Sequence, residues 1–214
     1  MFSSQIVRST LLSVAAFAGI STTAPVAAQE ITVTPPAEVA ALMAACTPID
    51  SQGPTIAEYM IERGWVPVAS EDQSASIPAF SAALFWSFMP DIPPDAREAN
   101  FDRLIAGVTG AVDSETSSFL SYNDEYVLLL WNGDSLSCIW AGPQSDAIDT
   151  LAVQLGGFPD SDGVATAGMR QRVEAGGREW ARGMAVGRTP AEDLPRSVAG
   201  SGMTDSARLD RSPI

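Results

Sequence analysis

The segment EYVLLLWNGDSLSCIWAG at residues 125–142 constrains the fold more than any other part of the sequence. Two apolar runs flank Asn132-Gly133, and this dipeptide is the strongest short signal for a β-hairpin. If these two residues form the loop, Val127 lies opposite Cys138. Alternate side chains of a strand point to opposite faces. Both faces are then apolar, one with Leu129, Leu136, Cys138 and Trp140, the other with Tyr126, Leu128, Leu130 and Ile139. The pattern predicts a sheet that is covered on both faces, or one that is covered on one face while the other stays apolar and exposed.

Several other segments carry apolar residues at helical spacing. Val39, Leu42, Met43 and Cys46 follow the spacing i, i+3, i+4, i+7, which defines one face of a helix. Segment 77–90 is apolar nearly all round, which favours a buried helix. The alternative is a helix that binds a partner or an apolar ligand. Helices are predicted within segments 34–46, 55–65, 77–90, 93–110 and 145–157.

Further strands are predicted on both sides of the hairpin. Residues 117–122 and 177–188 have the alternation of strands, and residues 206–214 are expected to form a last edge strand. Residues 189–205 between them are loop-like. The predicted fold class is α+β, with N-terminal helices packed on a small antiparallel sheet built around the 126–140 hairpin and with one disulfide.

The N-terminus has the three-part layout of a secretory signal peptide. Arg8 is the only charged residue before Glu30, an apolar stretch covers residues 11–20, and small residues precede Ala28. A membrane anchor is disfavoured because a spanning helix needs about 20 apolar residues. We therefore expect a protein that is exported to the periplasm or the exterior and does not span the membrane. The expected organisation is a cleaved signal peptide at 1–28, a single globular domain at 29–190 and a loop-like tail at 191–214.

Both cysteines of the chain, Cys46 and Cys138, lie on predicted apolar faces. The small residues before Cys46 are similar to a lipidation site. However, prolines and glutamates separate this cysteine from the apolar N-terminal stretch, which argues against lipidation. A redox role would favour a Cys-x-x-Cys pair or an exposed thiol beside a cation, and neither is visible. In an exported protein the economical prediction is a structural disulfide between Cys46 and Cys138.

The chain is strongly acidic, and its charge is unevenly distributed. It contains 26 acidic residues and 12 arginines, which gives a net charge of −14. Nucleic acid and anionic lipid are disfavoured as partners because like charges repel. Eight of the arginines but only six of the acids lie in residues 170–214. We expect this arginine-bearing segment to lie against the acidic body of the protein.

The residue types that are missing from the chain exclude several chemistries. Without histidine there is no serine–histidine or cysteine–histidine couple and no imidazole metal ligand. Without lysine there is no Schiff base. Two cysteines without histidine do not make the usual four-ligand zinc site. Carboxylate pairs, oxygen-ligated metals and an activated threonine or tyrosine remain. No catalytic, cofactor-binding or metal-binding residue is assigned.

Two sequence features partly match a functional site. The segment FPDSDGV places Asp160, Asp162 and Gly163 as in a calcium loop, but both end ligands of that loop are missing, so a turn is favoured. Adjacent acids occur at 71–72 and 124–125. Such pairs are common in solvated loops, and the sequence does not show whether carboxylates converge on a cleft.

Three functions remain open. We favour a non-catalytic binding or interaction module that takes an unknown protein or small molecule, because the catalytic residue types are depleted while apolar and aromatic residues are plentiful. The alternatives are a carboxylate-dependent hydrolase and a structural or accessory envelope protein. Two acids with shifted pKa values in a cleft would favour the hydrolase. A contiguous exposed patch of Trp, Phe or Leu would favour binding.

Overall fold

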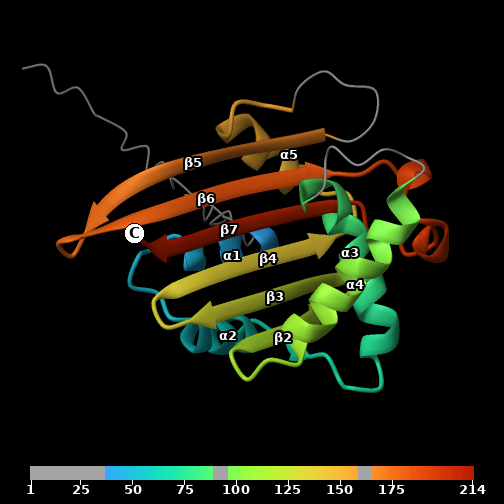
Figure 1. The fold of residues 1–214 in the computed structure, drawn as a ribbon, viewed down its shortest axis with the longest axis horizontal. Helices are drawn as coiled ribbons and strands as arrows, with labels where there is room; N and C mark the ends of the chain where they lie inside the picture. Colours follow the sequence, from blue (N-terminus) through green and yellow to red (C-terminus); the bar gives the residue numbers. More distant parts are fainter. Residues whose placement is uncertain (1–36, 89–95, 159–164) are drawn as a thin grey trace, which may run out of the picture. The chain divides into compact units, whose positions relative to one another are not determined.

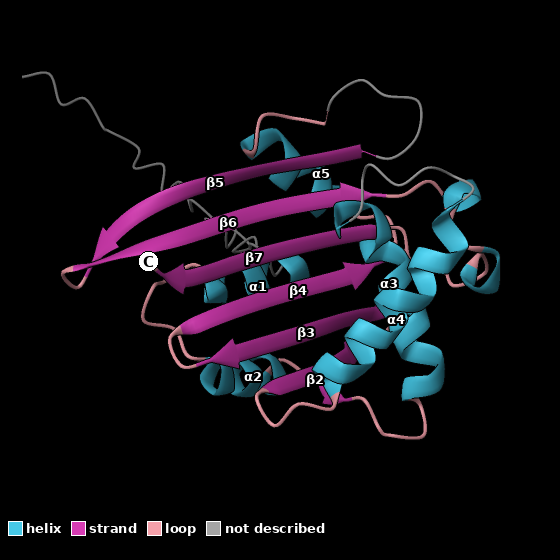
Figure 2. Cartoon of the chain, viewed as in Figure 1, coloured by secondary structure: helices cyan, strands magenta, loops and turns pink. Residues whose placement is uncertain are grey.

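The computed structural model describes residues 37–88, 96–158 and 165–214, and the expected signal peptide lies outside these residues. The described chain forms one antiparallel sheet with the strand order β1-β2-β3-β4-β7-β6-β5 (Figure 1). Each connection between sequence neighbours β2, β3 and β4 is a hairpin, and so is the connection between β5 and β6 (Figure 2). The strands are β1 (Val66–Pro67), β2 (Ser117–Tyr122), β3 (Glu125–Asn132), β4 (Ser135–Gly142), β5 (Ala165–Ala175), β6 (Arg178–Arg188) and β7 (Asp205–Pro213).

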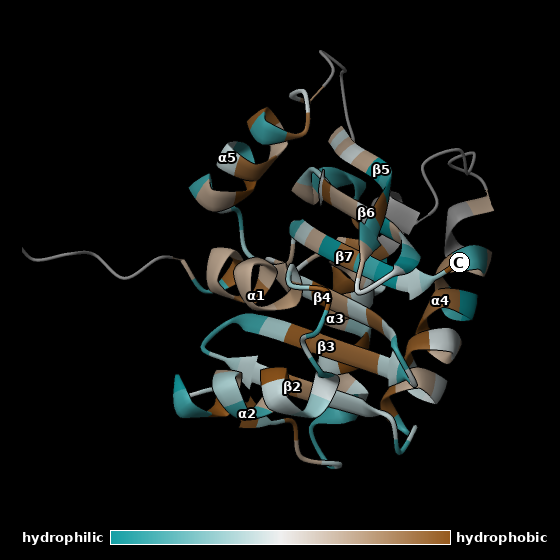
Figure 3. Ribbon diagram, turned by 90° about the vertical axis from the view of Figure 1, so that its left-hand side faces the viewer, coloured by the Kyte–Doolittle hydropathy of each residue, from teal (hydrophilic) through white to brown (hydrophobic). Residues whose placement is uncertain are grey.

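Helices pack on both faces of the sheet (Figures 1 and 3). One face, here called the α1 face, carries α1 (Glu38–Cys46), α2 (Gly53–Glu62) and α5 (Asp146–Gln154). The opposite face, here called the α4 face, carries α3 (Gln73–Phe88) and α4 (Arg97–Val112). Two short 3-10 helices, η2 (Ala191–Asp193) and η3 (Arg196–Val198), precede β7. None of the helices in the described ranges is long and apolar enough to cross a membrane.

Two apolar cores explain why β3 and β4 are apolar on both sides. On the α1 face, strand residues pack with helix residues in a core that includes Leu42, Met60, Trp65, Leu129, Trp140 and Ile148. On the α4 face, a second core includes Phe80, Leu84, Phe119, Leu128 and Ile139. Burial of this apolar surface is the main driving force for folding. The two sets of hairpin residues that the sequence assigns to opposite faces are therefore confirmed.

The register of the central hairpin differs from the predicted one. Asn132 pairs with Ser135, so Gly133 and Asp134 form the loop, and Cys138 lies opposite Leu129 instead of Val127. Gly133 has a φ of +57°, and glycine is favoured at the first position of such a loop because it has no Cβ to clash. The register shift moves each partner by two positions, so every side chain keeps its predicted face.

An α+β fold is present, but three details of the prediction need correction. The sheet is not small, because the 165–175 segment forms a strand that the sequence pattern does not predict, and because β7 joins it. The helices are not confined to the N-terminal part, since α5 follows β4. The segment expected to form an edge strand, 206–214, instead supplies β7, which lies between β4 and β6. Its charged residues find partners inside the fold.

The arginine-bearing segment is part of the sheet, where it supplies β5, β6 and β7. It contacts acidic residues of the preceding chain through ion pairs at 2.7 Å between Arg178 and Asp134 and at 2.7 Å between Arg188 and Asp149. Arg211 is buried on the α1 face and donates hydrogen bonds to the carbonyl oxygens of Pro48 and Ser51. The segment thus contacts the rest of the protein from within the sheet.

The predicted disulfide between Cys46 and Cys138 is present. Both residues are fully buried, and their Cα atoms lie 6.5 Å apart. The bond joins the last residue of α1 to the middle of β4, across the core of the α1 face. The first helix is therefore covalently fixed to the central strand.

Candidate functional site

Helices α3 and α4 cover only part of the α4 face (Figure 1). Toward the end of the sheet where the β3–β4 and β5–β6 turns lie, the described residues leave the surfaces of β4, β7, β6 and β5 uncovered. A pocket of about 910 Å³ lies here. One wall is formed by Gly110 and Ala111 at the C-terminal end of α4 and by Ser114 in the turn after it, and the strands form the floor.

One row of paired residues crosses the floor of this pocket. Arg170 of β5 pairs with Gly183 of β6, which pairs with Asp210 of β7, which in turn pairs with Ser137 of β4. Directly paired residues share a face, so these side chains all project to the α4 side. Gly183 has no side chain, and this leaves the floor hollow. A Cβ placed there would meet only ordinary contacts, at 3.7 Å from Arg170 Cγ and 3.9 Å from Met169 O.

The pocket is basic although the chain is acidic. Five arginines and a single acid, Asp210, line it. Strand alternation places Arg170, Arg172 and Arg208 on the pocket side, whereas Arg182 and Arg211 belong to the α1 face. The pocket side of the sheet therefore has a net positive charge.

The three arginines on the pocket side differ in whether their guanidinium groups are already paired within the protein. Arg208 forms an ion pair with Asp210 at 2.6 Å between Nε and Oδ2, and Ser137 donates a hydrogen bond of 2.5 Å to the same carboxylate. Arg170 and Arg172 are exposed, and neither forms an ion pair or hydrogen bond with the described residues. Two guanidinium groups are thus available to a ligand.

The chemistry of the pocket suits anions. Guanidinium groups bind carboxylates and phosphates through two parallel N–H···O bonds, and they stay charged over the accessible pH range. Hydroxyl groups of Ser114, Thr116, Ser137 and Ser212 lie among the lining residues and supply further donors. The only carboxylate among the lining residues is that of the paired Asp210.

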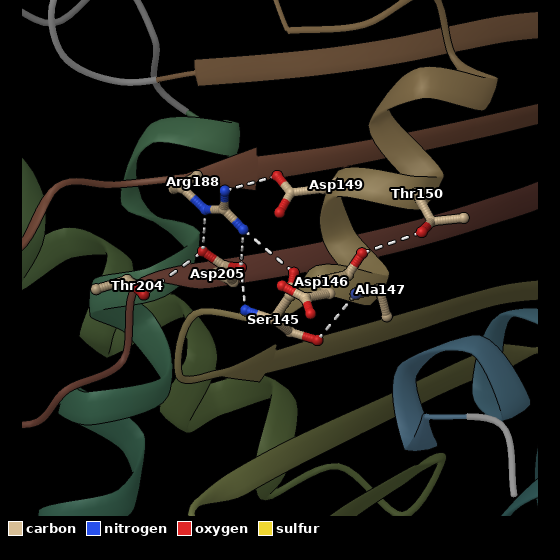
Figure 4. A network of polar contacts seen from close by, with 8 residues as sticks. All are labelled: Ser145, Asp146, Ala147, Asp149, Thr150, Arg188, Thr204 and Asp205. Carbon is tan, nitrogen blue, oxygen red and sulfur yellow. Dashed lines mark hydrogen bonds and ion pairs between the residues drawn. The ribbon is translucent and has the colours of Figure 1, made fainter. Parts of the chain in front are cut away.

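A second polar cluster lies around Asp205, where Arg188 pairs with Asp205 and Asp149 (Figure 4). Asp205 is fully buried and accepts bonds of 2.8 and 2.7 Å from Arg188, and a bond of 2.8 Å from the backbone N–H of Ser145. Arg188 also binds Asp149 at 2.7 Å. The hydrogen bonds that Arg188 donates to Asp205, together with the one it donates to Asp149, raise the pKa of its guanidinium group. Each charged group has its partner within the cluster, so this network holds α5 against β6 and β7.

Two glutamates with opposite pKa shifts lie on the α1 face. Burial raises the pKa of Glu125, and the charge of Glu38 raises it further, against a 2.6 Å hydrogen bond from the Trp140 indole. Burial also acts to raise the pKa of Glu38, but hydrogen bonds from Arg63 and Trp65 outweigh it and lower the pKa.

These glutamates lie outside two pockets of the described surface. Neither glutamate lines the large pocket on the α4 face. Neither lines a smaller one of about 390 Å³ between α1 and α2. Of the adjacent acids in the sequence, residues 71–72 are exposed in the turn before α3. Asp124 is exposed in the β2–β3 turn.

The other sequence features form no site in the described chain. Asp160, Asp162 and Gly163 of the calcium-like segment lie outside the described residues. Within the described ranges there is no group of three or more side chains able to hold a metal ion. Among the residues whose exposure is described, the large exposed apolar ones are scattered over several elements: they are Tyr59, Ile61, Val66, Val153, Met169 and Ile214. These six residues do not form the contiguous patch of Trp, Phe or Leu that would favour binding.

Sequence reasoning missed Arg170 and Arg172 because it missed β5. The signal was the alternation of Met169, Gln171 and Val173 with the two arginines, which is the period of a strand. No protein-family model, no curated protein and no solved structure matches this chain.

Proposed function

We propose that this protein is an exported, non-catalytic binding module that takes an anionic ligand in the pocket on the α4 face. The observation that carries the proposal is the pair of exposed arginines, Arg170 and Arg172, beside a hollow sheet surface. A protein with a net charge of −14 has few positive surfaces, and this one lines a pocket of about 910 Å³. Arginine is the usual side chain for recognition of carboxylates and phosphates.

Export and the absence of catalysis are supported by independent observations. A signal-like N-terminus and a buried disulfide are typical of proteins that fold in oxidising compartments. The pocket contains no histidine, lysine or cysteine, and its single acid is held by Arg208 and Ser137. These groups can bind and orient a ligand, and none of them is a free base that would activate the serine and threonine hydroxyls of the lining.

Titration calorimetry with citrate as the probe tests this proposal. We expect saturable binding that weakens as salt is added, because the attraction is between exposed charges. The Arg170→Gln and Arg172→Gln substitutions together should weaken binding about tenfold or more, as expected for the loss of two charge-assisted contacts. Arg178→Gln is the matched control, because it removes one charge from the same hairpin on the α1 face.

A second variant changes the shape of the pocket and leaves its charge intact. Gly183→Leu should fill the hollow floor and abolish citrate binding, whereas Gly183→Ala should weaken it less. A circular-dichroism melting curve checks that both variants fold. If citrate does not bind, or binds the arginine and glycine variants as well as the wild type, the pocket is not an anion site. The carboxylate-dependent hydrolase and the structural envelope protein would then be the remaining candidate functions.

A further inference from the structure

The outer edge of β5 has no partner strand among the described residues. β5 pairs with β6 along its whole length, from Ala165 opposite Arg188 to Ala175 opposite Arg178. It is the last strand of the sheet order, and in Figure 1 it is the outermost strand. An edge strand of this length presents a row of unpaired backbone N–H and C=O groups that can pair with another chain.

The two sides of β5 have different chemistry. Arg170 and Arg172 lie on the α4 face, where they line the pocket, while Met169 and Val173 lie on the α1 face. Met169 is 45% exposed although it is apolar. Charged residues on an edge strand normally limit pairing. Here Arg170 and Arg172 are both positively charged, so they repel a basic strand and favour an acidic one.

We propose that β5 binds an extended acidic segment of a partner protein as an additional strand of the sheet. Acidic side chains at two alternate positions of that segment face Arg170 and Arg172. The apolar side chains that flank the two acids face Met169 and Val173, and the side chain between the acids faces Gln171. This inference rests on the proposed function, because it uses the same arginines as the anion site.

The spacing of alternate side chains along a strand is the basis for assigning an acidic segment to this edge. Side chains two residues apart on one face of a strand are separated by roughly 7 Å, so an added strand repeats the separation of Arg170 and Arg172. Glu174 is the next residue on the same face, so an acid opposite it is disfavoured by like charge. The recognised pattern is therefore acid-x-acid within an otherwise apolar or neutral segment.

The position of the pocket also favours a chain over a small anion. The arginines stand on the outermost strand, whereas the rest of the pocket extends inward over β6, β7 and β4. A peptide paired with β5 places its carboxylates at the pocket mouth and leaves its backbone paired along the edge. Strand addition of this kind derives affinity from main-chain hydrogen bonds and specificity from alternate side chains.

Fluorescence anisotropy with labelled peptides tests the inference. One nine-residue peptide carries two glutamates at alternate positions among valines and threonines, and the second has the same composition with the glutamates adjacent. We expect the alternate peptide to bind about tenfold more tightly, because adjacent acids project to opposite faces. A third peptide with lysines in place of the glutamates should not bind.

Backbone pairing is tested with two further versions of the alternate peptide. Each carries N-methyl groups on every second amide, one version along each edge of the extended peptide. We expect one version to lose binding and the other to keep it, because only one edge faces β5. Equal binding by both versions would overturn strand addition.

The outcomes separate this inference from the proposed function. Arg170→Gln with Arg172→Gln should weaken both citrate and the alternate peptide, and Arg178→Gln should weaken neither. If citrate binds while the peptides bind equally or not at all, the anion site stands and strand addition is wrong. If the alternate peptide binds with the expected N-methyl pattern but citrate does not, the edge is a peptide site and the small-anion pocket is wrong. If neither binds, both proposals are wrong.

Discussion

At the scale of single residues, the buried carboxylate of Asp205 makes a testable contribution to stability. It is fully buried and binds both Arg188 and the backbone N–H of Ser145. Removing one partner of a buried ion pair leaves the other charge uncompensated. We expect Asp205→Ala to lower the free energy of unfolding by about 3–5 kcal/mol, measured by urea denaturation.

Asp149 provides the matched control for this prediction, because it binds the same arginine. Its side chain is 49% exposed, so its ion pair with Arg188 is screened by water. Asp149→Ala should cost at most about 1 kcal/mol. Equal losses for the two variants would show that burial does not set the strength of these pairs.

At the scale of elements, the glutamates that begin α1 and β3, Glu38 and Glu125, predict a pH dependence of stability. The pKa of Glu38 is lowered in the folded protein, so its contribution to stability is present above the unfolded pKa and is lost as pH falls through the folded value. The raised pKa of Glu125 acts in the opposite sense: its protonated form favours the folded protein at low pH, and stability is lost as pH rises through its folded pKa.

The two glutamine variants should therefore respond differently to pH. Glu38→Gln should lower stability at pH 7 by about 1 kcal/mol and by less at pH 3, because pH 3 lies below the usual glutamate pKa and the unfolded chain is protonated there. Glu125→Gln keeps an oxygen acceptor for the Trp140 indole, so it should leave stability at pH 7 equal or higher. Thermal melts at both pH values measure the difference. A loss at pH 7 in Glu125→Gln would contradict the assigned direction of its pKa.

At the scale of the whole molecule, the disulfide restricts the unfolded chain more than it shapes the folded one. It links positions that are 92 residues apart in sequence. In the chain-entropy model, a loop of this length contributes about 4–5 kcal/mol to stability. The Cys46→Ala and Cys138→Ala double variant should lose about that much in urea denaturation. Mass measurement before and after reduction checks that the wild-type bond is formed.

The sequence predicted the strands that are buried on both faces and that pair with their neighbours in sequence. The faces of β3 and β4 followed from alternating apolar residues such as Leu128 and Leu129. β5 was missed because an edge strand buries little, so charged residues replace the apolar signal. The interior place of β7 was missed because the partner of Asp205 lies in another strand and the partners of Arg211 lie after α1. The binding surface depends on β5, and its arginines could be assigned only when that strand was placed.

The position of β7 sets an order in time for the formation of the sheet. β1 to β4 form one half and β5 with β6 form the other, and the two halves pair only through β7. Because the chain is made from its N-terminus, the segments of both halves are synthesised before residues 205–213. Until then β4 and β6 each have an unpaired edge. The late arrival of one strand therefore converts two separate hairpin systems into a single cooperative unit, and it leaves β5 as the long edge that stays open.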